Sequence, residues 1–224
     1  MFPLYDTARS RKFPIVNILL IGLNALAFLY EIRMVPAELQ TFIVTNGLVP
    51  ARFIASPSEE WTRIFSSMFL HGGWFHIINN MWVLFIFGDN VEARMGRFRY
   101  LLFYLLSGTA AGLLQTYILP ASTAPMIGAS GAVAGVLGAY LILFPRSRVA
   151  SLVPILFIFT LVEIPAFVFL LFWFLSQLFS GWMSLQGGSA SGIAWWAHIG
   201  GFLFGVIMVS FFTIKNRTAY SNWQ

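Results

Sequence analysis

Long apolar runs that contain almost no charge constrain the fold of this chain more than any other feature of its sequence. Of its 224 residues, 58% are hydrophobic and 9% are charged, whereas soluble domains carry about 25% charged residues. A helix needs roughly 20 apolar residues to cross a bilayer and tolerates about 17. The apolar runs predict spans at 15–30, 74–87, 100–119, 127–144, 165–182 and 193–213. We therefore expect an all-α polytopic membrane protein with six transmembrane helices rather than a water-soluble fold.

Basic residues are distributed unevenly between the predicted loops. Cytoplasmic loops are rich in Lys and Arg, and with both termini in the cytoplasm ten of the 13 basic residues fall inside. The net charge of +5 then follows from orientation in the lipid bilayer, and no basic run or base-stacking motif indicates nucleic acid as a partner. We expect a multi-pass protein of a cell membrane, of the prokaryotic plasma-membrane type. The inner residues are Arg9, Arg11, Lys12, Arg94, Arg97, Arg99, Arg146, Arg148, Lys215 and Arg217, and the outer ones are Arg33, Arg52 and Arg63.

The whole chain, 1–224, is predicted to form a single membrane domain, with its core at about 13–213 and short cytoplasmic tails. The first span lacks a small-residue cleavage site and is too long for a signal-peptide core, so we expect it to remain as an anchor. Residues 151–182 are apolar but interrupted by Pro154, Glu163 and Pro165. This pattern favours one span from 165, with 149–163 at the inner interface. The chain has no cysteine, which excludes disulfide bonds and cysteine–zinc sites.

Three short polar islands interrupt the apolar runs. They contain His71, His76 and Asn80 in the first, Ser130 in the second and His198 in the third. Polar side chains at membrane depth are usually kept for function, and a serine, a histidine and further hydrogen-bond donors are what acyl transfer needs. In a six-span topology each island lies near the outer start of the second, fourth or sixth helix. We therefore expect all three at a similar depth, within reach of external water.

Each island has a structural interpretation as well as a chemical one. Small residues enrich packed membrane helices, and Gly131, Gly201 and Gly205 belong to rows that let two helices approach closely. A lone histidine, or His76 together with Asn80, could equally provide an interhelical hydrogen bond. Three islands of complementary chemistry at one depth favour the chemical interpretation.

Other catalytic chemistries lack their residues in this sequence. There is no His-Glu-x-x-His motif for a zinc protease. An aspartyl dyad needs two aspartates within the membrane, whereas Asp6 and Asp89 are both predicted near the inner surface. A metal site would require His71, at the membrane edge, to meet His198. We therefore expect neither a metal nor a cofactor.

Taken in order, these motifs resemble those of the rhomboid family of intramembrane serine proteases. The resemblance runs from about residue 47 to residue 205. It implies a rhomboid-like six-helix bundle in which Ser130 is the nucleophile and His198 the general base, without an acidic third member. It also implies that His76, Asn80 and the Ser130 backbone amide hold the oxyanion. The motifs are Gly47-Leu-Val-Pro50, Glu60-Trp-Thr-Arg63, His71 with His76 and Asn80, Gly88 through Glu92 to Gly96, Gly128-Ala-Ser130-Gly131, and Ala197-His198-Ile-Gly-Gly201 with Gly205.

The resemblance also implies structural positions, and the chain departs from the family at one place near the base. His71 matches an outer-loop histidine with a structural role. Some family members place an aromatic ring four residues after the nucleophile, stacked on the base, where this chain has Ala134. We therefore expect Trp195, Trp196 or a residue of the second helix to hold the His198 ring. The other structural positions are Glu60, Arg63, Glu92, Gly128, Gly131, Gly201 and Gly205.

A membrane helix hides its peptide bonds in internal hydrogen bonds. Substrates are therefore expected to be membrane proteins with unstable transmembrane helices, cleaved near the outer face through an acyl-enzyme. Entry is expected from the lipid past the fifth helix, with 180–192 as a cap hinged at Gly187 and Gly188. Two alternatives remain: a catalytically silent relative that binds and escorts membrane proteins, and a small transporter, which the absence of a continuous polar path disfavours. The sequence specifies no oligomeric state.

Overall fold

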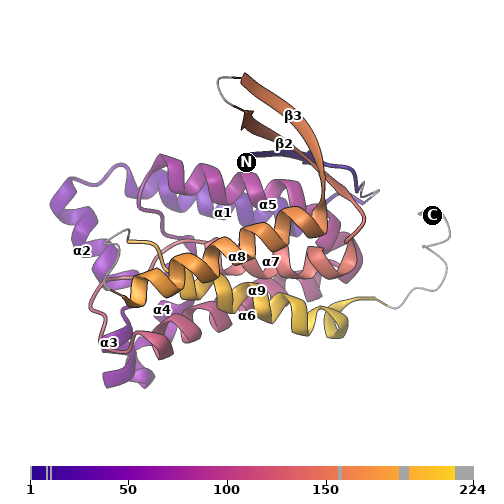
Figure 1. Cartoon of the computed structure of the whole chain (residues 1–224). Helices are drawn as coiled ribbons and strands as arrows, with labels where there is room; N and C mark the ends of the chain where they lie inside the picture. The colour runs from indigo at the N-terminus through magenta and orange to yellow at the C-terminus, as the bar shows by residue number, and fades with distance from the viewer. Residues whose placement is uncertain (1, 9, 11, 156–157, 187–191, 215–224) are drawn as a thin grey trace.

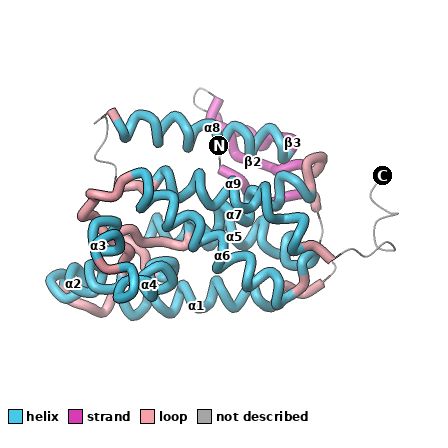
Figure 2. Tube along the Cα trace, turned by 90° about the horizontal axis from the view of Figure 1, so that it is seen from below, coloured by secondary structure: helices cyan, strands magenta, loops and turns pink. Residues whose placement is uncertain are grey.

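In the described part of the chain, six helices form the body of the protein, and they lie alongside one another (Figures 1 and 2). The computed structural model describes residues 2–8, 10, 12–155, 158–186 and 192–214. Within these residues, α7 is the central helix and contacts α5, α6, α8 and α9. The six helices are α1 (Ile15–Glu31), α5 (Trp74–Met95), α6 (Arg97–Ile118), α7 (Ser130–Leu143), α8 (Ala166–Leu185) and α9 (Trp195–Phe212).

The long connection between α1 and α5 folds into short helices at one end of the bundle (Figure 1). It contains α2 (Pro36–Asn46), α3 (Pro50–Ala55), α4 (Pro57–Ser66) and the 3₁₀ helix η1 (Ser67–Phe69). Each α helix begins at a proline, whose missing N–H is not needed in the first turn. Leu48 and Met126 exchange two backbone hydrogen bonds of 3.0 and 2.8 Å. These bonds attach the connection to the loop that leads into α7, and so help to place the start of α7.

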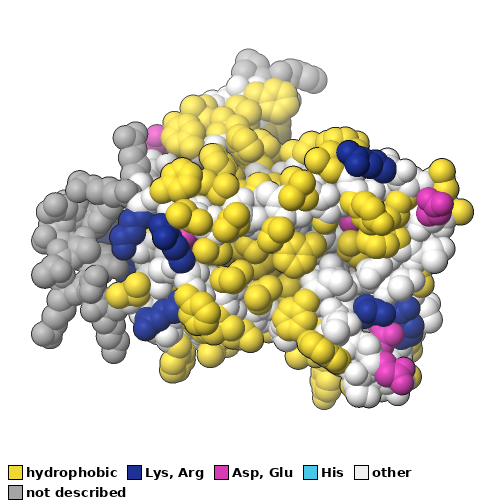
Figure 3. All heavy atoms as spheres, turned by 180° about the vertical axis from the view of Figure 1, so that it is seen from behind, with side chains coloured by type: hydrophobic (Ala, Val, Ile, Leu, Met, Phe, Trp, Pro, Cys, Tyr) yellow, Lys and Arg dark blue, Asp and Glu magenta, His cyan; other side chains and the backbone are white. Residues whose placement is uncertain are grey.

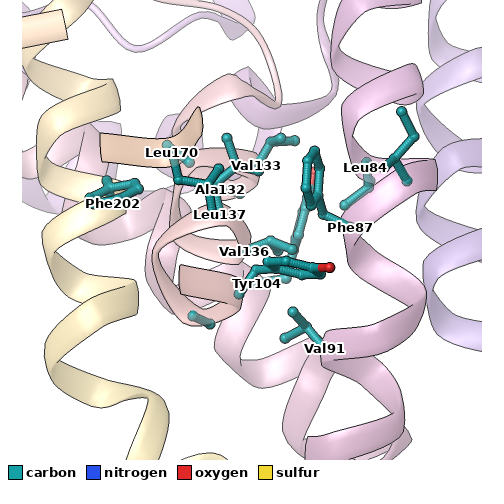
Figure 4. Packing of buried hydrophobic residues seen from close by; sticks show 14 of the residues in the cluster. Leu84, Phe87, Val91, Tyr104, Ala132, Val133, Val136, Leu137, Leu170 and Phe202 are labelled. Carbon is teal, nitrogen blue, oxygen red and sulfur yellow. The ribbon is translucent and has the colours of Figure 1, made fainter. Parts of the chain in front are cut away.

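The core forms around α7 because this helix is built largely of small and medium side chains. Every residue from Gly131 to Tyr140 is buried. Val136 and Leu137 of α7 lie between Phe87 of α5 and Phe202 of α9, as the close view shows (Figure 4). With 14 residues, α7 is only about 21 Å long at a rise of 1.5 Å per residue. Its first residue therefore lies inside the bundle, where neighbouring helices surround it.

The surface of the bundle is suited to lipid along its middle. Apolar side chains cover the central part of the face in Figure 3, and charged side chains lie toward its two ends. In the described part of the chain, α6, α8 and α9 are long and apolar enough to cross a membrane, while α1 and α7 are apolar but shorter. The six predicted spans thus correspond to six helices, whereas six crossings and the direction of insertion stay predictions. α5 is long but carries Asp89, Glu92 and Arg94 near its end.

The fold is mostly helical, as predicted, but it is not purely α, because three strands form an antiparallel sheet beside the helices (Figure 1). They are β1 (Phe2–Asp6), β2 (Arg148–Ile155) and β3 (Ile158–Pro165), in the order β1-β2-β3. The described residues of the region 149–163, expected at the inner interface, thus lie in two antiparallel strands. Proline disfavours a helix here, and β-branched side chains fit a pleated strand. The β-branched residues in this ladder include Val149, Val153, Thr160, Val162 and Ile164.

The N-terminal strand is held against the helices by side-chain hydrogen bonds. Trp82 Nε1 donates to the Pro3 carbonyl at 2.7 Å, and Asn90 Nδ2 donates to Asp6 Oδ2 at 3.0 Å. The Tyr140 hydroxyl also donates to Asp6. Burial is the main cause that raises the pKa of Asp6 to about 7, although both hydrogen bonds act in the opposite direction. The strand is therefore part of the folded protein and contacts both α5 and α7.

Two helices end three or more residues later than the sequence predicts. α5 continues to Met95, beyond the expected end at 87, because its polar last turns are satisfied inside the protein. It stops at Gly96, whose φ of +78° suits a residue without a side chain. α8 continues to Leu185, past the expected end at 182. The proposed hinges Gly187 and Gly188 lie outside the described residues.

Candidate active site

Ser130 and His198 lie within hydrogen-bond distance of each other although 68 residues separate them in the chain. Ser130 is the first residue of α7, and His198 is in the first turn of α9. Oγ of Ser130 and Nε2 of His198 are 2.8 Å apart. The structure thus places a serine hydroxyl directly against an imidazole nitrogen, which is the arrangement required for proton transfer between them.

Glycines allow α7 and α9 to approach closely enough for this contact. A Cβ on Gly201 would overlap the backbone carbonyl of Gly131, and a Cβ on Gly205 would overlap that of Gly135. Gly131 is itself packed against Ala111 of α6. The predicted row of small residues therefore lies in the contact between α7 and α9, and any larger side chain there would push the helices apart.

His76 and Asn80 face the same cavity as the serine and the histidine. They lie one turn apart on α5, and all four side chains line a cavity of about 700 Å³. Nδ2 of Asn80 is buried and has no hydrogen-bond partner among the described residues. A Cβ on Gly128 would lie 2.6 Å from His76 Nε2 and 3.7 Å from Asn80 Nδ2. The two side chains therefore converge on the backbone just before Ser130.

Gly128 needs to be glycine for two separate reasons. Its φ of +117° is a backbone conformation that side chains disfavour, and the His76 ring occupies the space that a Cβ would fill. Its amide donates to the carbonyl of Ser67 at 2.8 Å. The loop before α7 is consequently tied to η1 on one side and pressed against His76 on the other.

The second ring nitrogen of His198 has a partner that the sequence analysis missed. Nδ1 lies 2.8 Å from Oε1 of Gln177, a buried residue of α8. We expected a tryptophan to hold the His198 ring, and two tryptophan rings do lie near it. The ring centroid of Trp195 lies 6.0 Å from that of His198 in an edge arrangement, and that of Trp173 lies 6.2 Å from it. Gln177 is the one amide side chain in α8. A single amide in an otherwise apolar helix is the feature of the sequence that pointed to this residue.

His71 lies behind His76 and does not line the cavity. Its backbone amide donates to the carboxylate of Glu31 at 3.1 and 3.2 Å, and its Nδ1 lies 3.3 Å from the Phe69 carbonyl. Burial is the main cause that lowers the pKa of His71 to about 4, and the neighbouring His76 acts in the same direction. His71 is thus a neutral, buried group that joins the end of α1 to the loop before α5.

The remaining predicted structural residues lie away from the cavity. Glu60 of α4 forms an ion pair with Arg52 of α3 at 3.3 Å, and Arg63 donates to Thr62 Oγ1 at 3.2 Å. Glu92 accepts the amides of Val16 and Asn17, at 3.2 and 2.8 Å.

The contacts of Glu92 satisfy amide groups in the first turn of α1, which have no partner within their own helix. A carboxylate is also favourable at that position because the helix dipole is positive there. Within the described residues, no group of three or more His, Asp or Glu side chains is arranged to hold a metal ion.

A family model described as the Rhomboid domain matches residues 58–215, a range that contains all the cavity residues named above. This chain belongs to the rhomboid family. A protein named "Putative rhomboid protease YdcA" from Bacillus subtilis (strain 168) is 30% identical over 131 residues, covering 58% of this chain and 63% of that protein. "RHOMBOID-like protein 1" from Arabidopsis thaliana is 28% identical over 182 residues, covering 79% of this chain and 40% of the relative.

The names of these relatives include a protease and a rhomboid-like protein. The matched segments span 63% and 40% of the two relatives' own lengths. Membership of the rhomboid family therefore establishes what kind of protein this is, and its chemistry has to be argued from the cavity.

Proposed function

We propose that this rhomboid is an intramembrane serine endopeptidase with Ser130 as nucleophile and His198 as general base. The observation that carries the proposal is the 2.8 Å contact between Ser130 Oγ and His198 Nε2. The contact lies in the wall of a cavity that also presents His76 and Asn80. Asn80 Nδ2 has no hydrogen-bond partner among the described residues, so it is free to donate to a substrate oxygen in the cavity.

The reaction follows from these positions. A serine hydroxyl is a weak nucleophile until a base removes its proton, so His198 Nε2 accepts the proton as Ser130 Oγ attacks the peptide carbonyl. The carbonyl π electrons move to its oxygen and form the oxyanion. When the C–N bond breaks, His198 returns the proton to the leaving amine. Water then attacks the Ser130 ester with His198 again as base, which releases the acid product.

The oxyanion needs donors that are in place before the reaction begins. His76, Asn80 and the backbone amide of Ser130 supply them in this proposal, and one such donor is typically worth about 10²–10³ in rate. Asn80 Nδ2 has no competing protein partner among the described residues. It therefore forms its hydrogen bond to the oxyanion without first breaking one inside the protein.

The substrate class follows from the surroundings of the cavity. α8 rests mainly on α9, and a smaller share of it is buried than of α6 or α9. Phe167 and Phe172 of α8 are exposed, which suits contact with lipid. A membrane segment entering past α8 has to unwind before its peptide bond reaches Ser130. We therefore propose that the substrates are membrane proteins with unstable transmembrane helices.

The proposal includes a multi-pass position in a cell membrane, with six crossings and both termini in the cytoplasm. Its support is the excess of Lys and Arg in the inner segments. The cavity then opens toward the external side, at the end of the bundle where α2, α3 and α4 gather.

Labelling with a fluorophosphonate tests the proposal. Wild-type protein is expected to form a stable adduct and to cleave a reporter with a single transmembrane helix, whereas Ser130→Ala and His198→Ala do neither. Ser210→Ala is the matched control, because Ser210 is an exposed serine near the end of α9, away from the cavity. Equal labelling of wild type and Ser130→Ala, or a folded wild type that neither labels nor cleaves, would refute the proposal and favour a non-catalytic membrane-protein binder.

A further inference from the structure

The Gln177 side chain joins α8 to the imidazole of His198. We propose that Gln177 is a positioning residue that fixes the His198 ring with its proton on Nδ1, as an uncharged third member of the Ser130–His198 unit. The inference rests on the proposed function for its catalytic meaning. The proposed tautomer is a property of the protein without substrate, so it can be tested independently of the proposed function.

The orientation of the Gln177 amide follows from its other contacts. Its Nε2 donates to Ser176 Oγ at 2.9 Å and lies 3.3 Å from the Trp173 carbonyl. Since an amide nitrogen can only donate and a carbonyl can only accept, the nitrogen belongs on that side. The amide oxygen therefore faces His198 Nδ1, 2.8 Å away.

The amide oxygen decides where the imidazole proton resides. An oxygen acceptor next to Nδ1 requires an N–H there, and a neutral imidazole carries one proton on its two nitrogens. Nε2 is then left with a free lone pair, 2.8 Å from the Ser130 hydroxyl. This is the tautomer in which the ring can accept the serine proton. In the opposite tautomer, the lone pair of Nδ1 would face a lone pair of the Gln177 amide oxygen. Nε2 would then carry the proton and could not accept one from Ser130.

Gln177 also limits how the ring can turn. Gln177 is 6% exposed, so its side chain has little freedom to turn away from Nδ1. Trp173 and Trp195 contact the ring without presenting an acceptor to it. Ala134 of α7 is too small to stack on the ring, which leaves the hydrogen bond as the contact that sets the ring's rotation. During proton transfer the ring becomes positively charged, and hydrogen bonds to charged groups are stronger than neutral ones.

The surroundings of His198 contain little charge, so a charge introduced at Gln177 should have a clear effect on the ring. The side chains that hydrogen-bond to the ring are Ser130 of α7 and Gln177 of α8, and neither is charged. Among the described residues that line the cavity, His76 of α5 is the one titratable side chain other than His198 itself. A carboxylate in place of Gln177 would therefore add the first negative charge next to the ring among the described residues.

Two substitutions of Gln177 distinguish the effect of its hydrogen-bond acceptor from the effect of its volume. Gln177→Leu keeps a similar volume but removes the acceptor, and we expect kcat to fall by about 10- to 100-fold with little change in KM. Gln177→Glu keeps an acceptor, so kcat at neutral pH stays within about threefold. Its carboxylate favours the protonated ring, so the acid limb of kcat/KM against pH moves to higher pH.

A direct readout of the tautomer is available because the chain has three histidines. In protein with ¹⁵N-labelled histidine, we expect the His198 ring of wild type and of Ser130→Ala to carry its proton on Nδ1. In Gln177→Leu the ring should shift to the other tautomer or to a mixture. This spectrum needs no catalytic activity, so an inactive wild type with this pattern would refute the proposed function while leaving the positioning role intact.

Gln115→Leu is the matched control, because Gln115 of α6 is another buried glutamine whose side chain bonds to α9, where it accepts the Ala197 amide at 3.1 Å. We expect it to lower the melting temperature without changing the His198 tautomer or the acid limb. The positioning role is overturned if Gln177→Leu keeps wild-type kcat. It is equally overturned if the His198 tautomer is the same in Gln177→Leu as in wild type, or if Gln177→Leu and Gln177→Glu lose activity equally and only in proportion to lost stability.

Discussion

Asn80→Ala distinguishes a catalytic donor from a structural one, because the two roles predict opposite effects on activity and stability. The Asn80 side chain is 4% exposed, lines the cavity and has an unpaired Nδ2 among the described residues. If this amide stabilises an oxyanion, its contribution exists only in the transition state. The substitution should then lower kcat while the folded protein keeps its stability.

The structure sets the expected magnitudes. Losing one preorganised donor costs about 10²–10³ in rate, and because His76 and the Ser130 amide remain, we expect a loss of about 10- to 1,000-fold in kcat. KM should change by less than about threefold. No protein hydrogen bond from Nδ2 is lost, and truncation widens an existing cavity rather than opening a new one. The free energy of unfolding should therefore change by less than about 1 kcal/mol, since an unpaired buried amide is itself unfavourable.

The assay measures kcat and KM on a single-span reporter in liposomes, together with thermal unfolding of each variant. Asn46→Ala is the control, because that amide donates to the Phe42 carbonyl at 2.9 Å and does not line the cavity. His76→Ala should behave like Asn80→Ala, and the double variant should lose less than the product of the two losses. A pure KM effect would make this face a docking surface, and full activity in both single variants would remove it from the mechanism.

Three further predictions concern packing, pH and topology. Gly201→Ala should lower both melting temperature and activity, because its Cβ overlaps the Gly131 carbonyl, whereas Gly22→Ala meets nothing within 4 Å and should be neutral or stabilising; equal effects would contradict the close approach. Because burial raises the pKa of Asp6 from 3.8 to about 7, docking of β1 should be strongest at acidic pH and weaken as pH rises toward 7. Hydrogen exchange in β1 should report this trend, and its persistence in Asp6→Asn would refute it. A tag after Gln224 should be cytoplasmic and one inserted at 186–192 external, and finding both on one side would break the six-crossing arrangement.

Much of the architecture was predictable because hydrophobicity acts locally. Each of the six apolar runs contains a helix, and the helix that begins at Trp74 carries His76 and Asn80 one turn apart, as their spacing predicted. The hairpin at 148–165 was missed because an apolar stretch of β-branched residues next to predicted spans resembles more membrane helix. Only its pairing with Phe2–Asp6, more than 140 residues away in sequence, shows that it is sheet.

The candidate site divides in the same way. The sequence by itself determined which chemical groups are available, since a serine, two histidines and an asparagine stand out wherever the surrounding chain is apolar. Only the tertiary structure decided which atoms meet: it brings Ser130 Oγ to His198 Nε2 and leaves Asn80 Nδ2 without a partner among the described residues. It also supplies Gln177 from the helix past which substrate entry had been expected. The physical reason is that residue type is a local property. Hydrogen-bond partnership depends instead on how closely α7, α8 and α9 pack, which no single segment specifies.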